Sequence, residues 1–278
     1  MKPFFIITFF FGFILATIGC SSDEADADNG KTPKSIKAEN AAYVVSLEEL
    51  QPNDQYYNPD KKEGFVMNIQ SVEIFPNMNY SIQTTITERN KTMIITLGEI
   101  LKPDITLPAL GPARTTVSIP DNIRNITFVN AGKEDYFTLD ITDKALTLTA
   151  LYNPSFISSD YSVYFRRPKN TFAFVCGTNT NNKDLREKFI NKLTSSIKLK
   201  EYKFEGEGLI PWAIMSDGHW SNFPTKFYTY SNPQDFEKAG KILMEFAKDN
   251  LSANDGVTMS LWNWDGKTFY SWILDVQY

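Results

Sequence analysis

Apolar and polar residues alternate in short runs between Tyr43 and about Arg167. A period of two is typical of a half-buried β-strand, because successive side chains of a strand point to opposite faces. Pro, Gly, Asn and Asp lie between the runs, as expected of turns. The runs are Phe65–Ile69, Tyr80–Ile86, Met93–Leu97, Thr115–Ile119, Ile126–Asn130, Tyr136–Ile141, Leu146–Tyr152 and Tyr161–Phe165. We therefore expect seven or eight antiparallel strands and no helix in this part.

The pattern changes near Pro168. Thr171–Cys176 is continuously apolar after its first residue, which favours a buried strand, and a Gly- and Asn-rich turn follows it. Over the next segment, 183–197, apolar residues recur every four positions. They are Leu185, Phe189, Leu193 and Ile197. This spacing places all four on one face of a helix.

A second strand and helix follow in the same order. Lys226–Tyr230 predicts a strand, and the helix is expected to begin around Asn232, Pro233 and Asp235. Asparagine is a favoured helix cap, proline suits the first helical position, and an acidic residue stabilises the positive end of the helix dipole. The buried stripe of this helix is expected to comprise Phe236, Ala239, Leu243, Phe246 and Leu251.

Together these segments predict two domains. Residues 43–167 predict an antiparallel β-sandwich of immunoglobulin-like type, because short alternating strands separated by turns are typical of that fold. Residues 168–278 contain two strand-turn-helix units, each followed by a strand, and so predict a ferredoxin-like α+β domain with two helices packed on an antiparallel sheet.

The last segment predicts a β-hairpin. Asp265-Gly266 separates two strand-like runs and is a strong turn signal. With a two-residue turn, Trp262 faces Phe269 across the hairpin. One face then turns Val257, Met259, Leu261, Tyr270, Trp272 and Leu274 toward the core. The other face carries Trp262, Trp264 and Phe269.

The aromatic residues of that second face are the first binding candidates. Planar apolar surface with a polar rim suits a sugar ring or a protein partner, although packing against the protein itself is the alternative. The long connection 206–225 adds Trp212 and Trp220. The candidate binding residues are therefore Trp262, Trp264, Phe269, Trp212 and Trp220.

Carboxylates near the same connection supply the enzymatic alternative. Asp217 and His219 suit general acid-base chemistry, and Glu205 and Glu207 would share one face of a strand. No nucleophile is tied to them by spacing, and a turn accounts equally for Asp217-Gly218-His219. A hydrolase using these groups is thus the second hypothesis, and we identify no catalytic residue.

Composition removes other classes of function. The net charge is −5, and the mature chain is expected to carry −6, which gives no basic face for nucleic acid. Neither a GxGxxG nor a P-loop sequence is present, so we expect no nucleotide cofactor, and no metal site is expected. Of the two cysteines, Cys176 lies in the expected buried strand, where a thiol is usually a small core residue.

Residues 1–19 predict an export signal. Lys2 precedes an apolar stretch from Pro3 to Ile18, which is slightly short for a membrane-spanning helix. Its end, Leu15-Ala16-Thr17-Ile18-Gly19-Cys20, resembles the lipobox of bacterial lipoproteins, with Thr17 where an aliphatic residue is usual. The resemblance implies cleavage before Cys20 and acylation of its thiol.

Residues 20–42 predict a polar tether. The acidic run from Ser21 to Asp28 contains no apolar residue larger than alanine, so it cannot form part of a hydrophobic core. Ser21 directly after the cysteine resembles the outer-membrane sorting signal, and the acidic cluster is similar to the surface-export signal of Bacteroidetes-type lipoproteins. This resemblance implies a lipid-anchored protein of the outer membrane, at the cell surface.

The leading hypothesis is a non-enzymatic envelope lipoprotein that binds an envelope protein or a glycan through its folded body. A structural spacer without any ligand is the third hypothesis. We recognise no family in residues 40–278.

Overall fold

The alternating segments of the first part pair into a single large sheet. In the computed structural model, the described residues are 35–51, 63–105, 107–179, 183–212, 221–252 and 256–272, all within the compact unit 33–278. The strands of the first sheet are β1 (Tyr43–Leu50), β2 (Gly64–Phe75), β3 (Ser81–Arg89), β4 (Thr92–Leu101), β5 (Gly111–Ile119), β6 (Asn125–Asn130), β7 (Lys133–Ile141), β8 (Ala145–Ala150), β9 (Ile157–Ser158) and β10 (Val163–Phe165). Each of the eight expected runs overlaps one of them.

The strand order differs from that of a purely antiparallel sandwich. The order is β10-β8-β7-β6-β4-β3-β5-β2-β1-β9, and the pairs β1–β9, β3–β5 and β4–β6 are parallel. After the β3–β4 hairpin the chain returns to place β5 beside β2. The connection from β4 to β5 therefore passes β3, and the connection from β5 to β6 passes both strands of the hairpin. Those crossings create two of the parallel pairs. The expectation of an all-antiparallel arrangement was therefore wrong.

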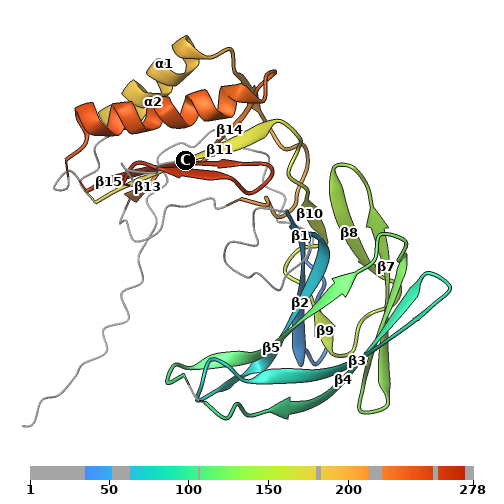
Figure 1. Cartoon of the computed structure of the whole chain (residues 1–278). Coiled ribbons are helices and arrows are strands. Elements are labelled where there is room, and N and C mark those ends of the chain that lie inside the picture. Colours follow the sequence, from blue (N-terminus) through green and yellow to red (C-terminus); the bar gives the residue numbers. More distant parts are fainter. Residues whose placement is uncertain are drawn as a thin grey trace, which may run out of the picture. The chain divides into compact units, whose positions relative to one another are not determined.

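This sheet curls around one apolar core (Figure 1). Its two ends come together, because the Tyr164 hydroxyl on the end strand β10 donates at 3.3 Å to the Val45 carbonyl on β1, which lies next to the other end strand, β9. The Ser159 hydroxyl donates to the same carbonyl at 2.8 Å and lies 2.5 Å from the Tyr164 oxygen. Curling of this kind is expected, since a twisted ten-stranded sheet rarely remains open.

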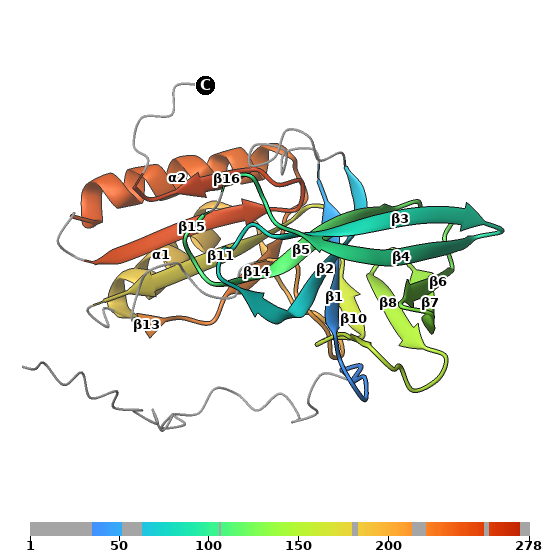
Figure 2. The ribbon, with the colours of Figure 1, turned by 90° about the horizontal axis from the view of Figure 1, so that it is seen from below.

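The second sheet is antiparallel and carries both helices on one face (Figures 1 and 2). Its elements are β11 (Thr171–Thr178), α1 (Lys183–Ser196), β12 (Lys200–Tyr202), β13 (Ser221–Asn222), β14 (Lys226–Thr229), α2 (Gln234–Asn250), β15 (Val257–Asn263) and β16 (Thr268–Tyr270). The order is β12-β14-β11-β15-β16, and β13 also pairs with β11. The mixed β and α+β class is thus confirmed, whereas the division into two domains near residue 168 stays a prediction.

Aromatic side chains fill the space between the second sheet and its helices. Phe172 and Phe174 of β11 are fully buried and contact Phe236 of α2 and Phe189 of α1. Both expected helices are confirmed, and the stripes of Phe189, Leu193, Phe236 and Leu243 are buried as the periodicity predicts.

The terminal hairpin has a different register from the expected one. Leu261 pairs with Phe269, and Trp262 pairs with Thr268. The Asn263 side chain accepts the Asp265 N–H at 2.6 Å, and Gly266 has φ +91°, so the loop contains three residues and its glycine takes the left-handed position. A shift of one residue reverses the faces. Phe269 therefore enters the core with Leu261.

We predict that Gly240→Ala destabilises the protein although alanine is the better helix former. An added Cβ at position 240 would lie 2.5 Å from the Phe269 ring, which is buried and packed on Phe236. Overpacking costs about 1–3 kcal/mol, against a propensity gain of about 1 kcal/mol. Urea unfolding measures the change. In a Phe269→Leu background the penalty should shrink, and an equal penalty there would contradict the assigned contact.

Candidate functional site

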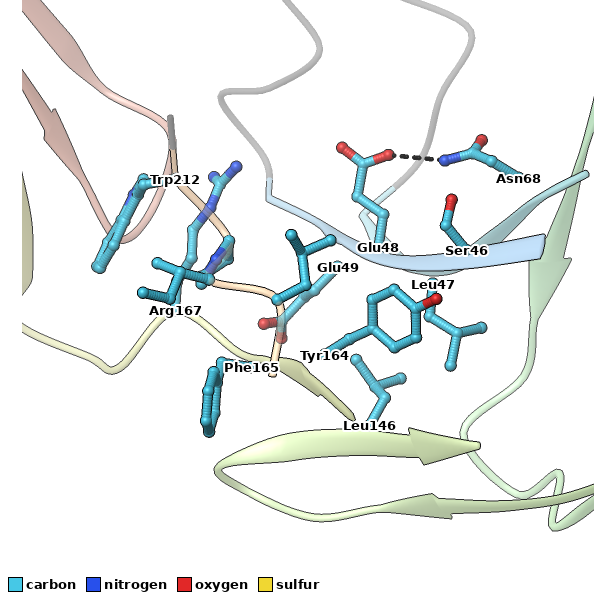
Figure 3. Close-up of a pocket in the computed structure, with 13 residues that line it drawn as sticks. Ser46, Leu47, Glu48, Glu49, Asn68, Leu146, Tyr164, Phe165, Arg167 and Trp212 are labelled. Carbon is cyan, nitrogen blue, oxygen red and sulfur yellow. Dashed lines mark hydrogen bonds between the residues drawn. The ribbon is translucent and has the colours of Figure 1, made fainter. Parts of the chain in front are cut away.

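A pocket of about 210 Å³ lies between β1, β10 and the segment 209–212 (Figure 3). Its lining residues are Ser46, Leu47, Glu48, Glu49, Asn68, Leu146, Tyr164, Phe165, Arg167, Leu209, Ile210, Pro211 and Trp212. They combine apolar walls with a few polar groups, which is the usual composition of a small-molecule site.

Strand pairing positions the first polar group of the pocket. Asn68 lies opposite Ser46 in the β1–β2 register. Its Nδ2 donates to Glu48 Oε2 at 3.1 Å, while its Oδ1 accepts the Thr116 hydroxyl at 2.8 Å. Both ends of the Asn68 amide are therefore engaged, which fixes its orientation and holds the exposed Glu48 carboxylate at the pocket.

The segment after β12 forms the opposite wall because it is hydrogen-bonded to β10. Leu209 N–H donates to the Val163 carbonyl at 2.8 Å, and Phe165 N–H donates to the Leu209 carbonyl at 2.9 Å. At Gly208 a Cβ would lie 2.9 Å from the Val163 oxygen and from the Phe165 ring. Glycine is thus required for this close approach.

Glu49 is the buried charged group of the pocket. Its side chain is 8% exposed, and its Oε1 accepts Arg166 Nε at 2.9 Å and Nη2 at 2.5 Å. Arg166 also lies over the Phe65 ring at 5.0 Å. The other carboxylate oxygen, Oε2, has no hydrogen-bond partner in the described part of the chain. A buried acceptor usually has a donor, so this atom marks a place where a ligand donor would be favourable.

The remaining charges at the pocket balance. Arg166 neutralises Glu49, while Glu48 supplies one negative charge and Arg167 one positive charge. Glu48 and Glu49 are consecutive on β1 and point in opposite directions, as Figure 3 shows. They cannot converge on one bond, so this pair lacks the geometry of a two-carboxylate hydrolase.

Tyr164 and Cys176 remain protonated near neutral pH. Burial raises the pKa of Tyr164 to about 12, and its hydroxyl serves as a hydrogen-bonding group next to Ser159. Burial likewise raises the pKa of the Cys176 thiol to about 12. The buried position expected for Cys176 is confirmed, and a high thiol pKa disfavours a nucleophile.

Among the sequence-predicted binding residues that the structure describes, Trp212 alone lines this pocket. Its ring is buried and stacks on Phe227, with centroids 5.5 Å apart, and its Nε1 donates to the Asn263 carbonyl at 3.4 Å. These contacts hold the indole as part of the wall. Trp220 lies outside the described residues.

The expected trio of Trp262, Trp264 and Phe269 does not share one surface. Phe269 packs in the core beneath the helices, and the partly buried Trp264 donates from Nε1 to the Tyr230 hydroxyl at 3.1 Å. The Trp262 ring instead lies edge-on to Tyr270, with centroids 5.8 Å apart, and Tyr270 contacts the tilted ring of Trp272 at 4.7 Å. Trp272 is 49% exposed, although it was expected to face the core.

Two groups of the hydrolase hypothesis, Glu205 and Glu207, belong to the described residues, and neither lines the pocket. Glu205 is exposed and Glu207 is partly exposed, and neither belongs to a strand. Asp217 and His219 lie outside the described residues, as do Cys20 and the whole export segment. Within the described ranges no three His, Cys, Asp or Glu side chains are grouped as a metal site.

Sequence reasoning missed Glu48, Glu49, Asn68 and Arg167. Arg166 and Glu49, which define the buried end of the pocket, are separated by 117 residues in the sequence. The only local signal was two consecutive charged pairs, Glu48-Glu49 and Arg166-Arg167, each at the edge of an apolar run.

Two further findings bear on identity. No helix in the described ranges is long and apolar enough to cross a membrane. No protein-family model matches the sequence, and comparisons with curated proteins and with solved structures find no match either.

Proposed function

We propose that this protein is a lipid-anchored envelope protein that binds a neutral glycan in the pocket beside Glu49. The observation that carries the proposal is that Glu49, a lining residue of the pocket, has a buried Oε2 without a hydrogen-bond partner in the described chain. A sugar hydroxyl is a neutral donor that would satisfy this acceptor.

The charge balance supports a neutral ligand over an ionic one. With Glu49 paired to Arg166, and Glu48 offset by Arg167, a cation or anion gains no net attraction. Apolar walls from Leu209, Ile210 and Pro211 suit the C–H face of a sugar ring, and acceptors at the rim suit its hydroxyls.

The proposed location rests on the export segment. Gly19-Cys20 after an apolar run supports acylation of Cys20, and the acidic tether supports the outer membrane and cell surface. Binding of surface glycan is a natural role for a protein held there. We propose this placement together with the binding activity.

We also propose finer fold relationships for the two sheets. Counted from β11, the four main strands of the second sheet lie in the order 2-3-1-4 with helices after the first and third, which supports a ferredoxin-like arrangement with β16 added. The packing of alternating strands around one core supports an immunoglobulin-like origin for the first sheet, with the β3–β4 hairpin as an insertion.

The Trp262–Tyr270–Trp272 cluster is the second candidate site. Exposure of Trp272 beside the ring of Tyr270 favours contact with a sugar or a protein partner, since aromatic residues are enriched at interfaces. It differs from the pocket in having no buried acceptor among its three residues.

The test is a glycan array probed with the unlipidated mature chain, followed by titration of the best glycan. We predict that Glu48→Ala weakens binding about tenfold or more, because a hydrogen bond to a charged group contributes about 1.5–3 kcal/mol. Glu88→Ala is the matched control, since Glu88 is an exposed glutamate on β3. Equal loss in both variants, or loss only in Trp272→Ala, would refute the pocket as the binding site.

A further inference from the structure

The strand β3 is paired on one side only along most of its length. One side pairs with β4 from Ser81 to Arg89. The other side pairs with β5 at Ser81 and Arg114, and beyond that point no strand in the described part of the chain pairs with it. Figure 2 shows β3 as the border of the sheet toward its turn. A row of unpaired backbone groups is a template for another strand. We call residues 82–89 the β3 edge.

The backbone groups of the β3 edge can be assigned to its two sides from both ends. The Tyr80 carbonyl points toward β5, because it accepts Arg114 N–H at 3.0 Å. At the turn, Arg89 pairs with Thr92, and the two residues between them have φ +49° and +62°, so Arg89 closes a two-residue hairpin and bonds toward β4. Backbone groups of successive residues point to opposite sides of a strand. The free N–H and C=O groups of the β3 edge are therefore those of Thr84, Ile86 and Glu88.

The side chain of Ile86 marks where the hydrophobic core lacks cover. Ile86 pairs with Ile95 of β4, so the two side chains lie on the same face of the sheet. Ile95 is fully buried in the core, whereas Ile86 is 44% exposed. The difference arises because no described strand lies beyond β3. A strand added to the β3 edge would therefore bury Ile86 as well as satisfy the backbone.

We propose that the β3 edge pairs with the β3 edge of a second copy of this chain, antiparallel and with Ile86 opposite itself. A two-fold dimer needs a surface that is complementary to itself. In this register Ile86 exchanges both backbone hydrogen bonds with its counterpart, and Thr84 does so with Glu88 on either side of the axis. Every free backbone group assigned above then has a partner.

The side chains of the β3 edge fit the same register. Ile86 meets its counterpart on the core-facing side, where both are removed from water. Glu88 lies opposite Thr84, and Arg89 lies opposite Gln83. No two like charges therefore face each other across the pair, an arrangement that would destabilise it.

Another register of equal length is less favourable. Centred on Thr85, it places the Glu88 carboxylate opposite the apolar Ile82. It also includes the register shift between β3 and β4, which lies between Ile82 and Thr84. The register centred on Ile86 covers residues 83–89 and leaves Ile82 outside.

The β3 edge is separate from the pocket of the proposed function, since no residue of β3 lines that pocket. Dimerisation and glycan binding therefore stand or fall independently. Seven residues from each copy make a small interface, and interfaces of this size are weak. The dimer is accordingly sought at protein concentrations of about 0.1–1 mM.

Disulfide formation tests the register in the full mature chain carrying Cys20→Ser, whose remaining native thiol, Cys176, is buried. Ile86→Cys places two thiols on the axis, where paired Cα atoms are about 5.5 Å apart and a disulfide fits. Thr84→Cys is the matched control on the same face, because its counterpart lies four residues along the strand, about 14 Å away. With a mild oxidant we expect covalent dimer from Ile86→Cys and none from Thr84→Cys.

Sedimentation equilibrium tests the dimer without a cross-link. Ile86→Lys is expected to weaken association at least tenfold, because two ammonium groups then face each other on the axis. Thr84→Lys is expected to retain the dimer, since the new charge lies opposite Glu88. A natural chain that remains monomeric at about 1 mM overturns the inference. Equal weakening by the two lysine variants, or cross-linking through position 84 in place of 86, overturns it too.

Discussion

Replacing Asp135 by alanine is expected to lower the free energy of unfolding by about 3 kcal/mol or more, because several buried donors lose their acceptor at once. Asp135 on β7 is 4% exposed, and its Oδ1 accepts the N–H and the hydroxyl of Ser155 at 2.7 and 2.9 Å. Its Oδ2 accepts Phe156 N–H at 2.9 Å and Ile157 N–H at 2.8 Å. These bonds hold the segment that pairs β9 with β1.

The matched control for this change is Asp140→Ala on the same strand. Asp140 is exposed, and a surface substitution of this kind is usually within about 0.5 kcal/mol of neutral. Chemical unfolding followed by circular dichroism measures both variants. Similar destabilisation of the two would contradict the role assigned to Asp135.

Replacing Cys20 by serine is expected to abolish membrane attachment of the mature protein. Serine offers no thiol for acylation, and each buried methylene of an acyl chain contributes about 0.8 kcal/mol to attachment. Fractionation of cells into soluble and membrane protein, with mass spectrometry of the N-terminal peptide, measures the effect.

Cys176→Ala is the control for the cysteine experiment, since the chain has two cysteines and this one is buried in β11. It should leave the protein in the membrane fraction. Continued attachment of Cys20→Ser, or release of Cys176→Ala, would remove the basis for the lipid anchor.

Periodicity predicted the elements of this fold well, because burial of one face leaves a direct trace in the sequence. The Phe189–Leu193 and Phe236–Leu243 stripes lie on the buried faces of their helices, and each alternating run overlaps a strand. Strand partners leave no such trace. The parallel pairing of β3 with β5 depends on where β5 returns, which no local pattern specifies.

The register of the hairpin and the residues of the pocket could not be predicted from the sequence, for different reasons. The Asp265-Gly266 turn was identified, but the capping bond from Asp265 N–H to the Asn263 side chain lengthens the loop by one residue and moves Phe269 to the other face. The pocket arises from contacts such as that between Glu49 and Arg166, which only the folded chain brings together.

A crystal structure of the protein with its best-binding glycan tests the central claim most directly. The account predicts a sugar ring between β1 and the segment 209–212, with one hydroxyl at hydrogen-bond distance, about 3 Å, from Glu49 Oε2. A glycan bound at the Trp262–Tyr270–Trp272 cluster, with the pocket beside Glu49 holding only solvent, would contradict it.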